Sequence, residues 1–143
     1  MRTIATCLFA FTLAAIAVPA TPSAQQVVRR VEEPTPLAAT DPLAIRSATV
    51  VKHILAGEAA LAVAALRKEA EADYAKGEAL EKQVTAHIAR LAPGKYKITS
   101  YEVGFGADVV VFLTNDKGED TNIVVRYNGD KKMTGLTEAK IQR

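Results

Sequence analysis

Apolar residues in the middle of the chain recur every three or four positions, as they do on one face of a helix. Asp41 and Pro42 form a helix start, because aspartate caps free amide groups and proline fits the first helical position. A glycine or a Pro-Gly pair follows each periodic segment. In the second segment Leu61, Ala65 and Ala72 share the expected apolar face. We therefore expect three helices, over residues 42–56, 58–75 and 78–91.

Beyond residue 94 the pattern changes to alternating or continuously apolar runs, which is typical of strands. Asn128-Gly129 predicts a two-residue hairpin turn with positive φ. Short turns between successive strands predict an antiparallel meander. The predicted fold class is therefore α+β, with three N-terminal helices packed on one face of a four-stranded antiparallel meander sheet. The four expected strands cover residues 95–103, 108–114, 121–127 and 131–136.

The second expected strand is apolar on both faces. Val109, Val111 and Leu113 lie on one face, and Val110 and Phe112 lie on the other. An antiparallel strand with one solvated face would alternate apolar and polar residues. The second face therefore either meets another layer of the chain, a ligand or a second subunit, or forms a small exposed patch on a central strand.

The N-terminus predicts an export signal. Arg2 precedes an uncharged, mainly apolar run over residues 4–18, followed by small residues, as in a secretory signal peptide. We expect a signal peptide over residues 1–20, cleaved after Ala20 or after Ala24, and a periplasmic or secreted protein. An uncleaved anchor is the alternative, although the run is shorter than the roughly 20 residues that span a bilayer. The only cysteine, Cys7, lies within this run, so the mature chain would lack disulfides and thiol nucleophiles.

Residues 21–41 contain prolines and no apolar periodicity, and they predict a flexible tether. The α+β domain is then expected over residues 42–138, with a C-terminal tail at 139–143. The whole chain has 18 basic and 16 acidic residues without a cluster of either sign, which argues against nucleic-acid binding. No second long apolar run follows the first, so we expect no membrane span in the mature chain.

Known metal and cofactor motifs are missing from the sequence. His53 is expected on a polar helix face and His87 on an apolar one, so a solvated and a packed, hydrogen-bonded histidine are the simplest interpretations. The acidic residues of 115–120 do not follow the spacing of a calcium-binding loop. Gly104-Phe105-Gly106 lacks the third glycine of a dinucleotide fingerprint. We therefore expect no metal and no cofactor.

The order of elements resembles the NTF2-like, or cystatin-like, superfamily over residues 43–138. Gly57-Glu58 resembles a step between its first two helices, and Val125-Arg126-Tyr127 with the residues 132–136 resembles the closing hairpin of its small exported members. The resemblance implies helices packed against a bent antiparallel sheet. Members include isomerases, dehydratases and non-catalytic domains, and many dimerise through the sheet.

Three functions are consistent with these features. The first is a non-catalytic exported module that binds a second copy as a homodimer, or a small apolar ligand between sheet and helices. The second is a small-pocket isomerase or dehydratase, for which the resemblance offers Tyr74, His87, Tyr96 and Asp108 as acid–base candidates. The third is an accessory subunit of an envelope assembly, with the tether giving reach. The tryptophans and aromatic pocket lining of the family's enzymes are missing, which favours the first function.

Overall fold

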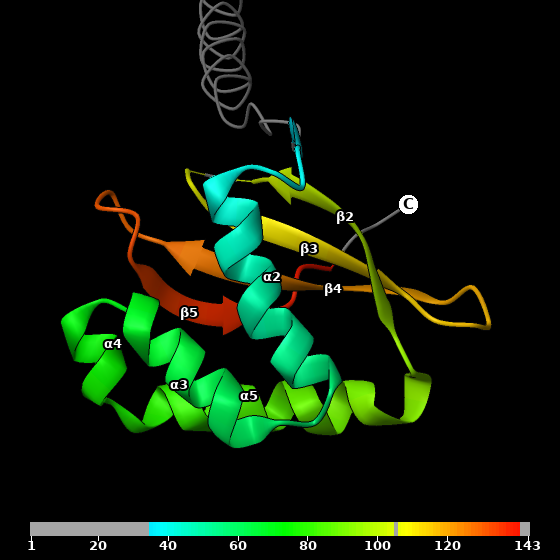
Figure 1. Ribbon diagram of the computed structural model, residues 1–143, viewed down its shortest axis with the longest axis horizontal. Coiled ribbons are helices and arrows are strands. Elements are labelled where there is room, and N and C mark those ends of the chain that lie inside the picture. The colour runs from blue at the N-terminus through cyan, green and yellow to red at the C-terminus, as the bar shows by residue number, and fades with distance from the viewer. Residues whose placement is uncertain (1–34, 105, 141–143) are drawn as a thin grey trace, which may run out of the picture. The chain divides into compact units, whose positions relative to one another are not determined.

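The computed structural model describes residues 35–104 and 106–140 of the 143-residue chain. The expected signal peptide over residues 1–20, most of the tether and residue 105 lie outside the described residues. In the described part, helices are followed by an antiparallel sheet (Figure 1). The predicted α+β class is therefore confirmed.

The first helix begins where the sequence places it. The Asp41 carboxylate accepts a hydrogen bond from the backbone N–H of Leu43 at 2.8 Å, and Pro42 occupies the first turn. The helix ends before Gly57, whose φ of +73° favours glycine. The helices are α2 (Pro42–Leu55), α3 (Ala59–Glu69), α4 (Ala72–Lys76) and α5 (Glu78–Leu91), followed by the 3₁₀ turn η1 (Ala92–Gly94).

The single helix expected over residues 58–75 is wrong, because the chain becomes extended at Ala70 and Glu71. The Glu71 N–H donates to the carbonyl of Met133 at 2.8 Å, and Ala70 forms a parallel bridge with the same residue. This contact covers part of the sheet edge, and tertiary pairing outweighs local helix propensity. The expected apolar face is also wrong, since Leu61 is 52% exposed. The buried residues of α3 are Ala62 and Leu66.

The sheet has five strands instead of the expected four. The additional strand, β1, lies in the expected tether and pairs with residues 101–103. The tether prediction is therefore wrong for residues 35–37. This strand has only three residues, one of them Pro36, so its sequence shows no alternation of apolar and polar residues. The strands pair in chain order, all antiparallel: β1 (Thr35–Leu37), β2 (Lys97–Val103), β3 (Val109–Thr114), β4 (Asp120–Tyr127) and β5 (Met133–Thr137).

The turn between β4 and β5 also differs from the prediction. Its closing hydrogen bond joins the Asn128 N–H to the Lys132 carbonyl at 2.9 Å, and the residue with positive φ is Lys131, at 56°, instead of Gly129. The Asn128 side-chain oxygen accepts from the N–H groups of Asp130 and Lys132 at 3.0 Å. These side-chain bonds stabilise a longer turn than an Asn-Gly pair alone would form.

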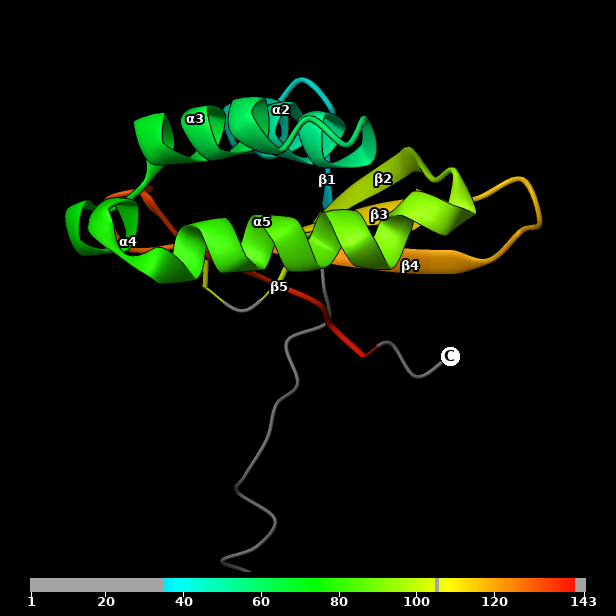
Figure 2. The same ribbon diagram turned by 90° about the horizontal axis from the view of Figure 1, so that it is seen from below.

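One core joins the helices to one face of the sheet. Ile54 of α2, Leu66 of α3 and Val84 of α5 are fully or almost fully buried with the helix-facing residues of β3, such as Val111. In Figure 1, α2 lies across the strands, and in Figure 2 α2 and α3 lie next to each other, above α5 and β4. A buried 2.8 Å hydrogen bond between the Ser47 and Tyr127 hydroxyls adds a polar contact to this core. Within residues 35–104 and 106–140, no helix is long and apolar enough to cross a membrane.

Two isoleucines of α2 test how much this core contributes to stability. Ile54 is 1% exposed and Ile45 is 53% exposed. We expect Ile54→Ala to lower the free energy of unfolding by about 2–5 kcal/mol, because it leaves a cavity, and Ile45→Ala to lower it by less than about 0.5 kcal/mol. Urea denaturation of both variants measures this. Equal losses would contradict the packing described.

Candidate functional site

Tyr74, the first acid–base candidate, has a structural position. Its hydroxyl donates to the Gln83 side-chain oxygen at 2.6 Å, and the same oxygen accepts from the backbone N–H of Leu136 at 2.9 Å. The two bonds link α4, α5 and the edge of β5. Burial raises the pKa of Tyr74 from 10.0 to about 12, so the side chain holds its proton firmly at neutral pH.

His87 lies on α5 and is only 8% exposed, as expected of a packed, hydrogen-bonded histidine. Its Nδ1 atom lies 3.1 Å from Nη2 of Arg90. Burial lowers the pKa of His87, and the positive charge of Arg90 lowers it further. His53, by contrast, lies on the partly exposed side of α2, with Nδ1 2.7 Å from the Glu58 carboxylate.

Tyr96 and Asp108 make contacts with other residues than Tyr74 and His87 do. Tyr96 packs beside Gly94 and against the core. Asp108 accepts from the backbone N–H of Tyr127 at 3.1 Å, and its second oxygen lies 3.6 Å from Nε of Arg126. Four open pockets of about 130 to 470 Å³ on the described surface are lined by none of the acid–base candidates. The structure therefore does not bring the candidates together in any of these pockets.

The described residues also lack a group of three or more histidine, aspartate or glutamate side chains close enough to hold a metal ion. The acidic turn of residues 115–119 is held by its own contacts. The Asn115 side-chain oxygen accepts from the N–H groups of Lys117 and Glu119, and its amide donates to the Glu119 carboxylate at 2.6 Å. This pattern is that of a self-capped hairpin turn.

The sheet face turned away from the helices, here called the outer face, has an apolar centre. Val110 and Phe112 of β3 and Val124 of β4 lie there, because the alternate residues of both strands belong to the helix-side core. Val110 pairs directly with Val124. They are 8% and 7% exposed. The strand predicted to be apolar on both faces is therefore observed. On its outer side the apolar residues form a small patch with polar residues around it.

Charges on the outer face are separated along β4. Its outward side chains are, in order, Asp120, Asn122, Val124 and Arg126. The acidic residue thus lies at one end of the strand and the basic residue at the other. Arg126 has a side chain that is 61% exposed, and its contact with Asp108 is long for an ion pair. Such a contact at the surface leaves the guanidinium able to form other contacts.

A segment of residues 138–140 borders the outer face after β5 ends. The Asn122 side chain holds it through two 2.9 Å hydrogen bonds, donating to the Ala139 carbonyl and accepting from its N–H. An open pocket of about 390 Å³ lies between this segment and the sheet, with Phe112 on the sheet side. Ala139, the first residue of the predicted tail over 139–143, is therefore bonded to β4 through the Asn122 side chain.

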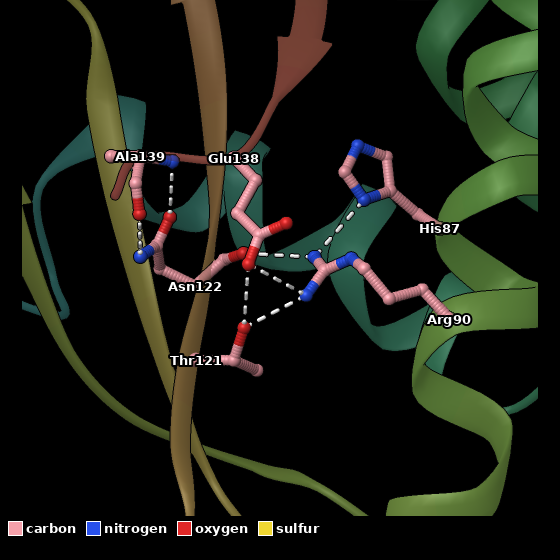
Figure 3. A network of polar contacts seen from close by, with 6 residues as sticks. All are labelled: His87, Arg90, Thr121, Asn122, Glu138 and Ala139. Carbon is pink, nitrogen blue, oxygen red and sulfur yellow. Dashed lines mark hydrogen bonds and ion pairs between the residues drawn. The ribbon is translucent and has the colours of Figure 1, made fainter. Parts of the chain in front are cut away.

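Arg90 joins the same segment to α5, in an arrangement that we call the clasp (Figure 3). Its Nη1 donates to the Thr121 hydroxyl at 2.8 Å and lies 3.3 Å from the Glu138 carboxylate. Its Nη2 donates to the backbone carbonyl of Asn122 at 3.0 Å. The clasp consists of His87, Arg90, Thr121, Asn122, Glu138 and Ala139.

The clasp satisfies backbone groups where the sheet loses its edge strand. The β4–β5 register ends at the pair Val124 and Thr137, so the Asn122 carbonyl has no ladder partner there. A buried carbonyl without a partner is costly, and the Arg90 guanidinium supplies the donor. Sequence reasoning identified His87 but missed Arg90 and Asn122, because their partners are distant in the chain. The one local signal is a polar asparagine directly before the apolar run of β4.

A comparison of the chain with protein families, with curated proteins and with solved structures found no match. The outer face and the clasp are therefore the candidate functional features of the described chain.

The Tyr74 environment predicts an alkaline titration. The contribution of Tyr74 is the difference between the ultraviolet pH titrations of the wild type and of Tyr74→Phe. This difference should have its midpoint near 12, because burial disfavours the phenolate. The raised pKa also means that this tyrosine contributes stability below pH 10.0, which is lost as the pH rises toward 12. A midpoint near 10 for Tyr74, while circular dichroism shows that the protein is still folded, would show that its hydroxyl is solvated.

Proposed function

We propose that the protein is an exported, non-catalytic binding module that associates with a second copy of itself through the outer face. The observation that carries this proposal is the apolar centre of Val110, Phe112 and Val124 on a sheet face opposite to all the core-forming helices. Dimerisation through the sheet is also what the resemblance to the NTF2-like superfamily implies.

The other binding mode considered from the sequence, a small apolar ligand between sheet and helices, has less support. That space is occupied by side chains that are fully or almost fully buried, including Ile54, Leu80 and Val111. Interiors packed in this way leave no room for a ligand. Catalysis by the four acid–base candidates has less support too, because none of them lines any of the four pockets described above.

The charges of β4 fit a second copy. In a face-to-face dimer, the two-fold axis can lie in the plane of the interface and run perpendicular to the strands. The β4 strands of the two copies then lie on each other in antiparallel directions. Arg126 of each copy then faces Asp120 of the other, with the apolar residues at the centre. A strand with opposite charges at its two ends is therefore complementary to the same strand of a second copy. A partner surface of a single charge sign would be repelled at one end of the strand.

The expected dimer is weak and reversible. Val110 and Val124 are already shielded by their neighbours, so little apolar area remains to be buried at the centre of the face. Interfaces with a small apolar core and a polar rim belong to transient complexes more often than to obligate ones. We expect a dissociation constant in the micromolar range.

Charge reversal tests the proposed dimer. We expect Arg126→Asp to weaken self-association at least about tenfold, since Asp120 of the other copy then meets a like charge. The double variant Asp120→Arg with Arg126→Asp should restore most of the affinity, because the exchanged charges are complementary again. Sedimentation velocity at micromolar to millimolar concentrations measures both. Lys82→Asp, on the exposed surface of α5, is the matched control and should not change association.

Two results would overturn the dimer proposal. One is a wild-type chain that remains monomeric at every concentration. The other is a dimer that is unaffected by Arg126→Asp, which would place the interface elsewhere on the molecule.

Export is the second part of the proposal and depends on the apolar run after Arg2. Fusing residues 1–24 to a β-lactamase without its own leader should give ampicillin resistance, because the enzyme protects cells only from outside the cytosol. Mass spectrometry of the exported full chain should find an N-terminus at Thr21 or Gln25. A full-length chain that begins at Met1 and stays in the cytosol would contradict the proposal.

A further inference from the structure

The contact between His87 and Arg90 fixes the protonation state of the histidine. Arginine has only donors, so in the 3.1 Å contact Nδ1 of His87 must be the acceptor and carries no proton. The ring is therefore neutral in the clasp, with its proton on the other nitrogen. This neutral ring is a condition for the arrangement in Figure 3.

Charged and polar groups from three parts of the chain surround the ring. Arg90 of α5 disfavours a positive charge on His87, whereas Glu138, after β5, favours it. The backbone of Leu136 in β5 also favours the protonated ring. From β4, Thr121 and Asn122 act on the ring through Arg90, to which both are bonded. Burial and Arg90 outweigh Glu138, so the pKa of His87 lies below its usual 6.5.

We propose that the clasp is an acid-operated latch, in which protonation of His87 releases Arg90 and frees the segment of residues 138–140 from β4. A protonated ring has no lone pair to accept the Arg90 hydrogen bond, and it places a second positive charge beside the guanidinium. Arg90 holds the segment through Glu138 and holds the end of β4 through Asn122. Loss of its anchor on His87 therefore weakens both contacts.

The direction of the effect follows from proton linkage. A histidine whose pKa is lowered in the closed clasp binds a proton more readily when the clasp is open. The closed clasp is thus fully favoured above pH 6.5, and it loses stability as the pH falls below that value. The segment opens before the domain unfolds, because a few polar contacts outside the core hold it, whereas the core residues are buried.

The latch goes beyond the proposed function and does not depend on it, since it operates within one chain. Its structural consequence lies at the outer face. The segment of residues 138–140 forms one wall of the pocket of about 390 Å³ beside Phe112. Opening removes that wall and exposes the Asn122 end of β4.

Amide hydrogen exchange at Ala139 tests the latch, because its N–H is bonded to the Asn122 side chain. The protection factor of this amide, corrected for intrinsic exchange, should fall several-fold between pH 7.5 and 5, by at most about tenfold per pH unit for one proton. His87→Asn provides a neutral acceptor near the position of Nδ1, and its Ala139 protection should not vary over this range. His53→Asn, which changes the other histidine, should keep the wild-type dependence.

The histidine pKa is a second measurement that does not require His87 to be replaced. In NMR titrations Glu138→Gln should lower the His87 pKa further, and Arg90→Gln should raise it. Either of two results would overturn the proposal. The first is Ala139 protection that does not change with pH in the wild type. The second is the same pH dependence in wild type and His87→Asn, which would assign the effect to another group.

Discussion

Strand β3 is apolar along its length, and water has to be kept from both of its sides. On the helix side Val109, Val111 and Leu113 are fully buried by the core. On the outer side Val110 is shielded by neighbouring strands, and no helix of the described chain belongs to that face. Val110 and Val124 are 8% and 7% exposed, so the neighbouring strands already keep most water from the centre of this face. A second copy would cover the partly buried Phe112 beside them, and this is the reason for proposing a partner on the outer face.

The clasp solves a different problem at the same sheet. Backbone groups need partners wherever a ladder ends, and β5 stops pairing with β4 after Thr137. Asn122 replaces the missing strand bonds with its side chain, and Arg90 takes the open carbonyl. The same guanidinium contacts a buried, neutral histidine. The hydrogen bond from Arg90 to the Asn122 carbonyl therefore depends on the protonation state of His87.

Local signals predicted the elements that local contacts stabilise. The start of α2 follows from Asp41, which caps it, and α5 has the bounds expected between Gly77 and the Pro-Gly pair. The break at Ala70 and the short strand β1 were missed, because each is stabilised by pairing with a distant strand. The same reason explains the clasp, whose Arg90 bonds residues more than thirty positions away. The outer face was predictable because alternation alone places Val110 opposite to the core.

The most direct test of the account is a map of the surface that changes when the protein becomes concentrated. Amide chemical shifts recorded at increasing concentration should change for residues of the outer face, led by Val110, Phe112 and Val124. They should remain constant on the exposed side of α3 and α5, for example at Ala60 and Thr85. Shifts confined to the helices, or no shifts at concentrations where the chain is shown to be dimeric, would contradict the assignment of the outer face as the binding surface.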